Sequence, residues 1–504
     1  MLSRLSASLW VAALTTTVAT AAELKSVSLD DCLRQAIEKN LSLRISRYDP
    51  QLAQINLHSA YSGYDPTFNS SVGQTFSTIP RQTSTNLGAF TPQAGETWRD
   101  SYSMGLNGLT PYGLQYGLNG NLARNNSKQF AFDANNNPIS LVNSGYNDSA
   151  ALSLRQPVLK NFWIDGTRLN IALAKESLKQ SVESVRDEIL GLTRNVAVGY
   201  YGLIATKDAI RVQESALNLA ERSLAENKKR VEVGAMAPLE EKQAEAQVAA
   251  RKADLILARQ NFDRAVNGMK RLISDDFGGL DGTSYEPTAV LEAIPEAFSR
   301  QDSWHKALSQ RPAIITQKID LAKRHISLRY AKNQLYPELD LTGSFGLSGN
   351  QRAVGAVLGD LSDRRNPNFS FGIELSVPLT RRLAKDRLKT ERLGIESALL
   401  NYKDLEQSIM REVDDYILVS RSSFERVGAT KAAQAFAEAA LDAEQKKLEN
   451  GKSTSFQVLS LQRDLVNAQR DSISALTDYN IALVNLAWAE GSLLEKLKVN
   501  VTVR

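Results

Sequence analysis

The side chains that most often carry out chemistry are few in this chain and far apart in the sequence. Its three histidines, His58, His305 and His325, do not have the spacing of a metal-binding motif such as His-Glu-x-x-His. The sequence also lacks a phosphate-binding glycine loop, a nucleophile elbow and a pair of cysteines. We therefore expect a protein that is not an enzyme, with no catalytic residue, no cofactor and no metal site.

The only cysteine, Cys32, cannot form an internal disulfide. Helical spacing places it on one face with Leu29, Ala36 and Ile37, which predicts a small side chain buried in an apolar core. The formal net charge is only +4, so the composition does not predict a nucleic-acid partner. With 7% aromatic and 23% charged residues, the composition is closer to that of a coiled coil than to that of a compact enzyme.

The first 21 residues have the pattern of a secretory signal peptide. Arg4 gives the positive start, residues 9–14 form a short apolar stretch, and small residues precede a cleavage site near Ala22. That stretch is too short to span a membrane, and no later stretch approaches the roughly 18 apolar residues that a spanning helix needs. We expect an exported protein without a helical membrane anchor.

Apolar residues spaced by three or four positions predict two very long helices, over 166–233 and 383–449. Each spans roughly 100 Å at about 1.5 Å per residue, which is more than a compact domain needs. Shorter helices are predicted over 237–273, over 454–497, from Ser28 to about Tyr64, and from Ser299 to about Tyr336.

Alternating apolar and polar residues predict β-strands within 66–157 and within 338–378. Thr110–Gly113 is predicted as a tight turn between two of these strands. The segments 78–96 and 125–148 are rich in Asn, Thr, Gln and Gly, and we predict long polar loops there. Each predicted strand therefore has one apolar face and one polar face.

The apolar faces need a partner other than water, and in an exported chain a closed β-barrel in a lipid bilayer provides it. Glu374 alternates with the apolar Phe371, Ile373 and Leu375, so we expect it to face the barrel lumen. One chain supplies roughly four to six strands, fewer than the smallest barrels, and must therefore oligomerise. Three copies with twelve strands are the smallest comfortable arrangement; the hairpin around Thr110–Gly113 could raise that number or lie outside the membrane.

The predicted elements occur twice in one order: short helix, strands, long helix, glycine turn, short helix. Matching breakers stand at the same points of both halves: Pro66 and Pro337, Pro157 and Pro378, and the helix-turn tips Gly234 and Gly451. The predicted organisation is a signal peptide (1–21), repeat 1 (22–274), a linker with little regular structure (275–298) and repeat 2 (299–504).

This order of elements resembles the TolC family of outer-membrane efflux proteins over nearly the whole mature chain. The strand-to-helix junctions Gln156–Leu159 and Val377–Leu379 and the turns Arg230–Gly234 and Lys447–Gly451 carry the resemblance. It implies a mainly α fold with β, in which a homotrimer forms an α-helical periplasmic tunnel capped by an outer-membrane β-barrel. It further implies a passive exit duct of a tripartite efflux or type I secretion system, with a periplasmic adaptor and an inner-membrane pump as partners.

The resemblance also implies a pore entrance just after the two glycine turns, where the family carries acidic residues. The corresponding positions are Glu240 and Glu241 in the first repeat and Gln457 and Ser460 in the second, where many relatives have aspartate. A ring that attracts cations would therefore have to come from the first repeat. From the residues alone, Glu240 and Glu241 are also ordinary first-turn acids that favour a helix N-terminus, and both interpretations stay open.

An exported coiled-coil stalk or adhesin would share the signal peptide and the long helices. Two separate returns to strand, each with one apolar face, argue against a single head domain of that kind. A periplasmic adaptor protein would have one helical hairpin and a β-rich body without a lipid-facing band, which fits the duplication poorly.

Overall fold

The computed structural model describes residues 23–79, 94–132, 137–234, 236–280 and 282–499, so the predicted signal peptide lies outside the described residues. The described residues form two compact units. The helical unit comprises the residues up to Tyr48, Glu183–Ile315 and the residues from Leu405, and the sheet unit comprises Asp49–Val182 and Thr316–Asp404. No described helix is long and apolar enough to cross a membrane.

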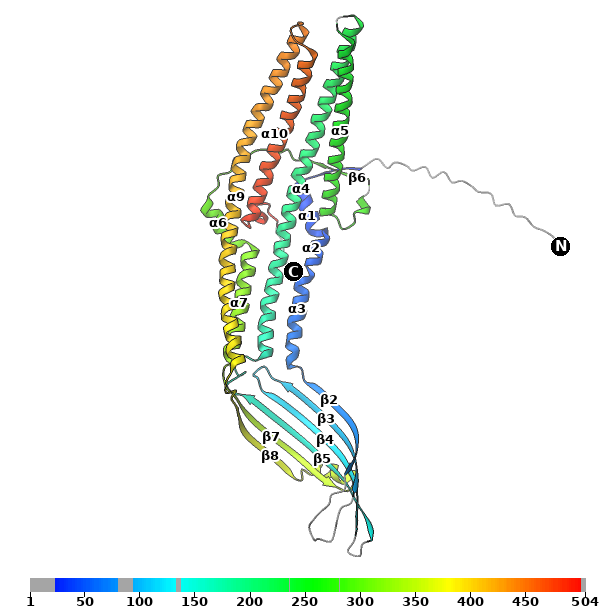
Figure 1. Ribbon diagram of the computed structural model, residues 1–504, viewed down its shortest axis with the longest axis vertical. Helices are drawn as coiled ribbons and strands as arrows, with labels where there is room; N and C mark the ends of the chain where they lie inside the picture. Colours follow the sequence, from blue (N-terminus) through cyan, green and yellow to red (C-terminus); the bar gives the residue numbers. More distant parts are fainter. Residues whose placement is uncertain (1–22, 80–93, 133–136, 235, 281, 500–504) are drawn as a thin grey trace, which may run out of the picture. The chain divides into compact units, whose positions relative to one another are not determined.

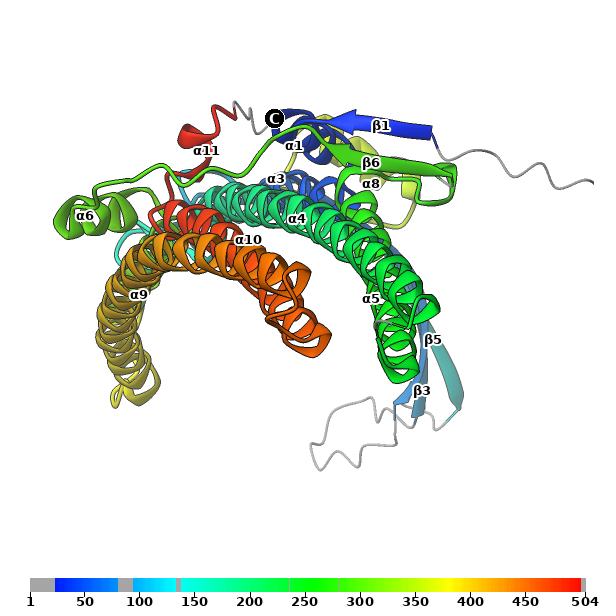
Figure 2. The ribbon, with the colours of Figure 1, turned by 90° about the horizontal axis from the view of Figure 1, so that it is seen from above.

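Two helical hairpins dominate the helical unit. In Figures 1 and 2, α5 lies beside α4 and α10 lies beside α9. The helices are α4 (Gly166–Glu232), α5 (Pro238–Ile273), α9 (Arg382–Glu449) and α10 (Ser455–Ala489), and the first parts of α4 and α9 belong to the sheet unit. The bounds of both long helices lie within one residue of the predicted ones. The prediction of one helix up to residue 497 was wrong, because Gly491 adopts φ +75° and ends α10 before a short helix, α11 (Leu493–Lys496).

The shorter helices are more divided than the sequence predicts. The helix predicted from Ser28 to Tyr64 breaks at Asn40, whose side chain accepts a hydrogen bond from the N–H of Leu43 and starts a new helix. The helix predicted from Ser299 to Tyr336 breaks at Pro312, whose ring suits the first position of a helix and cannot continue the preceding one. The resulting elements are α1 (Leu29–Lys39), α2 (Leu41–Ser46), α3 (Tyr48–Ala60), the 3-10 helix η1 (Tyr61–Tyr64), α6 (Arg300–Gln310) and α7 (Pro312–Asn333).

The core of the helical unit is built by α1, α4 and α5. Cys32 and Ala36 of α1, Val196 and Leu203 of α4, and Met269 of α5 belong to one cluster and are at most 1% exposed. The prediction that Cys32 is a small buried core side chain is therefore confirmed. A capping box at the N-terminus of α1, between Ser28 and Asp31, helps to hold that helix in place.

The linker predicted over 275–298 contains regular structure that the sequence did not indicate. Besides a 3-10 turn, it forms β6 (Thr283–Pro287), which pairs in parallel with β1 (Glu23–Val27). The phenol of Tyr200 in α4 donates to the carbonyl of Val27 at 3.1 Å, which ties this two-stranded sheet to the helices.

The sheet unit contains a six-stranded sheet in which every neighbouring pair is antiparallel (Figure 1). The strand order is β2-β3-β4-β5-β7-β8, so the first repeat supplies four strands and the second supplies two. The strands are β2 (Thr67–Ile79), β3 (Ala94–Leu109), β4 (Gln115–Phe132), β5 (Pro138–Pro157), β7 (Glu338–Gln351) and β8 (Pro367–Ser376). The predicted turn at Thr110–Gly113 joins β3 to β4, with Gly113 at φ +86°.

The polar loop predicted over 125–148 is wrong for the residues that the structure describes, because β4 continues to Phe132 and β5 begins at Pro138. Of the loop predicted over 78–96, residues 80–93 lie outside the described residues, and the residues at its two ends belong to β2 and β3. A further unpredicted element, α8 (Val354–Ser362), stands between β7 and β8. Polar residues on both faces hide a strand from a pattern that depends on alternation.

Candidate functional site

One face of the six-stranded sheet carries an apolar band that runs from edge to edge. A single register row crosses all six strands and carries one large apolar side chain on each: Phe68, Leu106, Leu118, Leu152, Phe345 and Phe369. These side chains are 37% to 78% exposed, and Phe371 further along β8 reaches 89%. Such a continuous exposed apolar surface requires an apolar surrounding.

The opposite face of the same strands is polar. The neighbouring register row consists of small or hydrogen-bonding residues: Thr67, Asn107, Gly117, Ser153, Ser344 and Ser370. Hydroxyl pairs bridge adjacent strands on this face, at 2.7 Å between Ser71 and Ser103 and at 2.8 Å between Ser344 and Ser370. Water or a polar solute is the fitting neighbour of this face.

A charged cluster lies on the polar face where the strands meet the helices. The guanidinium of Arg155 donates from Nε to Asp340 at 2.7 Å and from a terminal nitrogen to Glu338 at 2.9 Å. Lys160 reaches the second oxygen of Glu338 at 3.4 Å. Glu374 is exposed and stands opposite Asp340 in the register, on the polar face as its alternation with apolar residues predicts.

The cluster around Arg155 was missed in the sequence, although the signal used for Glu374 was present. Asp340 stands between the apolar Leu339 and Leu341, so its parity places it on the polar face. Side chains on one face of neighbouring strands interact directly, and Arg155 and Asp340 meet in this way across β5 and β7.

The two glycine turns have the left-handed backbone that their predicted role requires. Gly234 has φ +74° and Gly451 has φ +71°, a region that other residues adopt only at a cost. The N–H of Gly234 donates to the carbonyl of Val231 at 3.0 Å, and that of Gly451 to the carbonyl of Leu448 at 3.0 Å. Both long helices therefore end in the same way before their shorter partners begin.

Three of the four predicted entrance residues lie in the first turns of the two shorter helices, and the fourth, Ser460, lies in the second turn of α10. Glu240 and Glu241 begin α5 and are partly exposed, and one carboxylate oxygen of Glu240 is buried without a hydrogen-bond partner among the described residues. Gln457 is exposed, and its N–H donates to the side chain of the capping residue Thr454 at 3.4 Å.

Ser460 is partly exposed and accepts a hydrogen bond from Arg463 at 3.3 Å. The turns of the two hairpins are close in space, because the hydroxyl of Ser455 lies 3.9 Å from the sulfur of Met236. Further along, Gln462 of α10 donates to Ser223 of α4 at 3.2 Å.

A capping interaction at the second turn was not anticipated. Glu444 accepts a hydrogen bond from the hydroxyl of Ser453 at 2.5 Å and one from the ammonium of Lys447 at 2.9 Å. These two contacts, the hydroxyl first, lower the pKa of the Glu444 carboxyl below its ordinary value. Glu444 therefore stays ionised and ties the residues after Gly451 back to α9.

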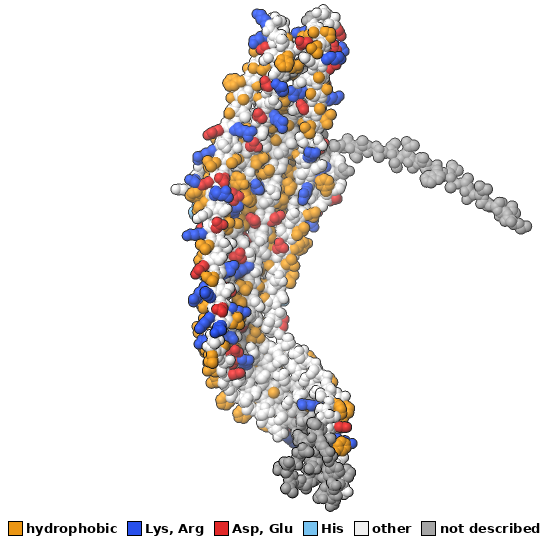
Figure 3. Space-filling model, in the orientation of Figure 1, with side chains coloured by type: hydrophobic (Ala, Val, Ile, Leu, Met, Phe, Trp, Pro, Cys, Tyr) orange, Lys and Arg blue, Asp and Glu red, His pale blue; other side chains and the backbone are white. Residues whose placement is uncertain are grey.

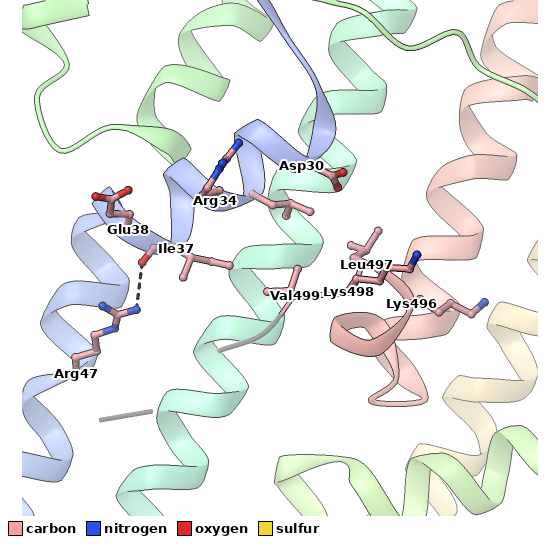
Figure 4. A pocket seen from close by; sticks show the side chains of 10 residues that line it. Asp30, Arg34, Ile37, Glu38, Arg47, Lys496, Leu497, Lys498 and Val499 are labelled. Carbon is pink, nitrogen blue, oxygen red and sulfur yellow. Dashed lines mark hydrogen bonds between the residues drawn. The ribbon is translucent and has the colours of Figure 1, made fainter. Parts of the chain in front are cut away.

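Charged side chains of both signs are scattered over the helices (Figure 3). Figure 4 shows a groove between α1 and the segment after α11, lined by Arg34, Glu38, Arg47 and Lys498 among others, with Arg47 donating to the carbonyl of Ile37 at 3.2 Å. Cations, the two acids Asp30 and Glu38, and apolar side chains are mixed there. In the part of the chain that the structure describes, no group of three or more His, Cys, Asp or Glu could hold a metal ion.

A family model described as outer membrane efflux protein matches residues 113–274 and 304–492, more than half of the chain. The match covers β4, β5 and all of α4, α5, α9 and α10, and begins after β2 and β3.

Two curated relatives and one solved structure agree with this match. The chain is 24% identical to "Outer membrane protein TolC" of Escherichia coli (strain K12) over 310 residues, which are 60% of this chain and 62% of that protein. It is also 24% identical to the protein of the same name from Vibrio cholerae, over 71% of this chain and 78% of that protein. The chain thus spans less than two thirds of the E. coli relative. The crystal structure of CusC is 16% identical and covers 92% of both chains with a TM-score of 0.67, which shows the same fold.

Proposed function

We propose that this chain, which belongs to the outer membrane efflux protein family, forms the exit duct of an export system that is driven from the inner membrane. The protein is located in the outer membrane, with its helical tunnel in the periplasm. Cargo passes through the duct without covalent change, and the energy comes from an inner-membrane pump. The pump belongs to a tripartite efflux or a type I secretion system.

The apolar register row across all six strands is the observation that carries this proposal. Phe68 at one edge is 66% exposed and Phe369 at the other is 78% exposed, so the whole face is open to its surroundings. Burying such side chains in lipid is favourable by roughly 1.5–3 kcal/mol each, whereas leaving them in water promotes aggregation. An exported stalk or adhesin would leave this apolar face in water. The face therefore supports a membrane channel over a stalk.

We further propose that the duct is a homotrimer that docks to a periplasmic adaptor. Six strands are fewer than the eight of the smallest membrane barrels, so a single chain cannot close one. Unpaired strand edges are not tolerated in the hydrocarbon region. Both facts support a barrel shared between copies, which surrounding outer-membrane lipid then covers.

We assign the cation preference of the periplasmic entrance to Glu240 and Glu241. They lie close to Gly234, at the start of α5, whereas Gln457 and Ser460 hold the matching positions of α10 without a charge. One carboxylate oxygen of Glu240 has no hydrogen-bond partner among the described residues. A residue of a second copy or a passing cation would supply that partner. In a pore, fixed carboxylates raise the local cation concentration.

The decisive experiment combines native mass spectrometry of the detergent-purified protein with single-channel recording in a planar bilayer. A trimer with discrete, cation-preferring openings is the expected result. The double variant Glu240→Gln/Glu241→Gln should lose most of that preference, and Gln457→Asp/Ser460→Asp should increase it. Glu38→Gln, an exposed acid of α1 outside the turns, serves as the control and should leave the preference unchanged. A water-soluble monomer without conductance would refute the duct.

A further inference from the structure

The structure assigns a barrel of eighteen strands to the assembled protein. We propose that β8 of each copy pairs with β2 of the next copy, so that three copies of the six-stranded sheet close one cylinder. This inference rests on the homotrimer proposed above. It concerns which strands cross the membrane, and it places the hairpin β2–β3 inside the barrel wall, although the family match begins only at residue 113.

The side chains of β2 and β3 show that this hairpin shares the environment of the other strands. Phe68 and Val72 of β2 are 66% and 74% exposed, and Met104 of β3 is 60% exposed. Phe68 stands in the same register row as Leu118 of β4 and Phe369 of β8. A hairpin outside the membrane would expose these side chains to water, so the apolar row places β2 and β3 in the bilayer with the rest.

The two edges of the sheet fit each other. Among the described residues, β2 and β8 each pair on one side only, and the edge that remains offers free N–H and C=O groups. Because all five neighbouring pairs are antiparallel, the first and last of the six strands also run in opposite directions. β8 of one copy and β2 of the next would therefore continue the antiparallel pattern, and a sum of eighteen is even, as such barrels require.

The register within one chain already corresponds to the strand tilt of a membrane barrel. The row that starts at Thr67, the first residue of β2, reaches β8 at Ser370, six residues before its last residue, Ser376. Six residues over five steps between strands correspond to a tilt of about 40°, at about 3.3 Å per residue and about 4.8 Å between strands. Membrane barrels have tilts of about 35–45°.

The same geometry restricts the contact between copies to two registers. The shift per copy must be even, because an odd shift would bring the apolar face of one copy beside the polar face of the next. Shifts of six and eight residues per copy correspond to tilts of about 35° and about 42°. A shift of six places Glu374 opposite the next copy's Asn69, and a shift of eight places it opposite the next copy's Ser71. All three residues lie on the polar face.

Disulfide crosslinking of the full-length trimer tests the strand count. In a Cys32→Ala background, which removes the only native thiol, Glu374→Cys is combined with Asn69→Cys or with Ser71→Cys. Oxidation should give covalent dimers and trimers on a denaturing gel for one of the two pairs, and reduction should return the monomer. Glu374→Cys with Asn107→Cys is the matched control, because Asn107 lies on the same face of the interior strand β3 and should not crosslink.

A different pattern of crosslinks would overturn the inference. If Glu374→Cys links instead to Asn119→Cys or Asn121→Cys of β4, the barrel has twelve strands and β2–β3 lies outside it. A conducting trimer that crosslinks at neither β2 position also refutes the eighteen-stranded wall, while the proposed function stands. Native mass and conductance of each variant are measured before oxidation. Loss of the trimer or of conductance at that stage counts against the proposed duct and not against the strand count.

Discussion

Burial changes the chemistry of individual side chains in the helical unit, and Cys32 is the clearest case. Its side chain has no exposed surface, and desolvation raises the pKa of its thiol to about 11, with the charge of Asp31 adding to the effect. The neutral thiol is favoured in the fold, since a thiolate would lose its hydration there. The residue thus acts as an apolar core side chain and not as a nucleophile.

We predict that Cys32 does not react with thiol reagents at pH 8 while the protein is folded. The expected result is no labelling by a maleimide in the native trimer and complete labelling after denaturation. Because the pKa of the thiol in the folded protein lies above its ordinary value of 9.0, the contribution of Cys32 to stability is present below pH 9 and is lost as the pH rises towards about 11. Labelling of the native protein at pH 8 would contradict the burial of this thiol.

Trp488 shows how two cations can share one ring. The guanidinium of Arg194 lies 4.8 Å from the ring centroid, and that of Arg311 lies 4.9 Å from it. Arg194 also donates to Asn485 at 2.6 Å, and Arg311 donates to Glu412 at 2.6 Å. The indole of Trp488 in α10 therefore contacts Arg194 of α4 and Arg311, the residue between α6 and α7. Each of the two guanidinium groups also keeps a second hydrogen-bond partner.

We predict that Trp488→Leu lowers the stability of the protein by about 1–3 kcal/mol, because two cation–π contacts and part of the packing of the half-buried ring are lost. Trp488→Phe keeps a smaller ring with a weaker quadrupole, so its effect should be intermediate. The thermal midpoint of the detergent-purified variants gives the measurement. Equal midpoints for Trp488→Leu and the parent would show that the two guanidinium contacts contribute nothing.

At the scale of the elements, helix ends depend on a few glycines. Gly491 has φ +75°, and an added Cβ would lie 3.2 Å from the backbone nitrogen of Arg311 and 3.3 Å from the backbone carbon of Gln310. The backbone of another segment cannot yield as a flexible side chain can. Gly428 in α9 is the opposite case, because an added Cβ would meet nothing within 4 Å.

We predict that Gly491→Ala destabilises the protein by about 1–2 kcal/mol or more, from the left-handed backbone alone, with the backbone contact adding to it. Gly428→Ala is the matched control and should stabilise by up to about 1 kcal/mol, because alanine favours a helix. Both are measured by thermal or chemical denaturation of the purified trimer. The reverse order of the two variants would refute the role of the positive φ at Gly491.

The elements that the sequence predicts well are those with local, repeated signals. Apolar spacing and the breakers Gly234 and Gly451 define the long helices almost to the residue. The pairing of β1 with β6 has no such signal, because each strand has only five residues and its partner is about 260 positions away. The outer parts of β4 and β5 were predicted as loops because the polar runs 124–129 and 143–145 interrupt the alternation of apolar and polar residues.

The residues of the candidate site also differ in how well the sequence predicts them. The turns and the first-turn acids Glu240 and Glu241 follow from residue types near a glycine, and their place in α5 matches. The ion pair of Arg155 with Asp340 does not follow from the local sequence, because the two residues are 185 positions apart in the chain. Only the register of β5 with β7, which depends on the whole sheet, brings these two side chains together.

At the scale of the whole molecule, the two faces of the sheet decide where the chain can reside. Neighbouring residues of one strand have opposite surroundings: Leu118 faces the apolar side, and Asn119 faces the polar side. A lysine on the lipid face of a membrane barrel costs about 2–4 kcal/mol near the middle of the bilayer, whereas a lysine in the lumen stays hydrated.

We predict that Leu118→Lys strongly reduces the amount of trimer in the outer membrane, whereas Asn119→Lys assembles normally. Asn119→Lys should also shift the ion preference of the open channel towards anions, because it adds a positive charge to the lumen. Gel analysis of unheated outer-membrane fractions reports the trimer, and bilayer recording reports the ion preference. Equal assembly of the two variants would show that the apolar row does not face lipid.

The hairpin β2–β3 has a consequence for how such ducts diversify. A hairpin leaves and re-enters a sheet at the same end, so gaining or losing one keeps the junction from η1 into the sheet and the junction from β5 towards α4 at the same end of the strands. In the proposed trimer, one hairpin more or less per copy would change the barrel by six strands without adding or removing a helix.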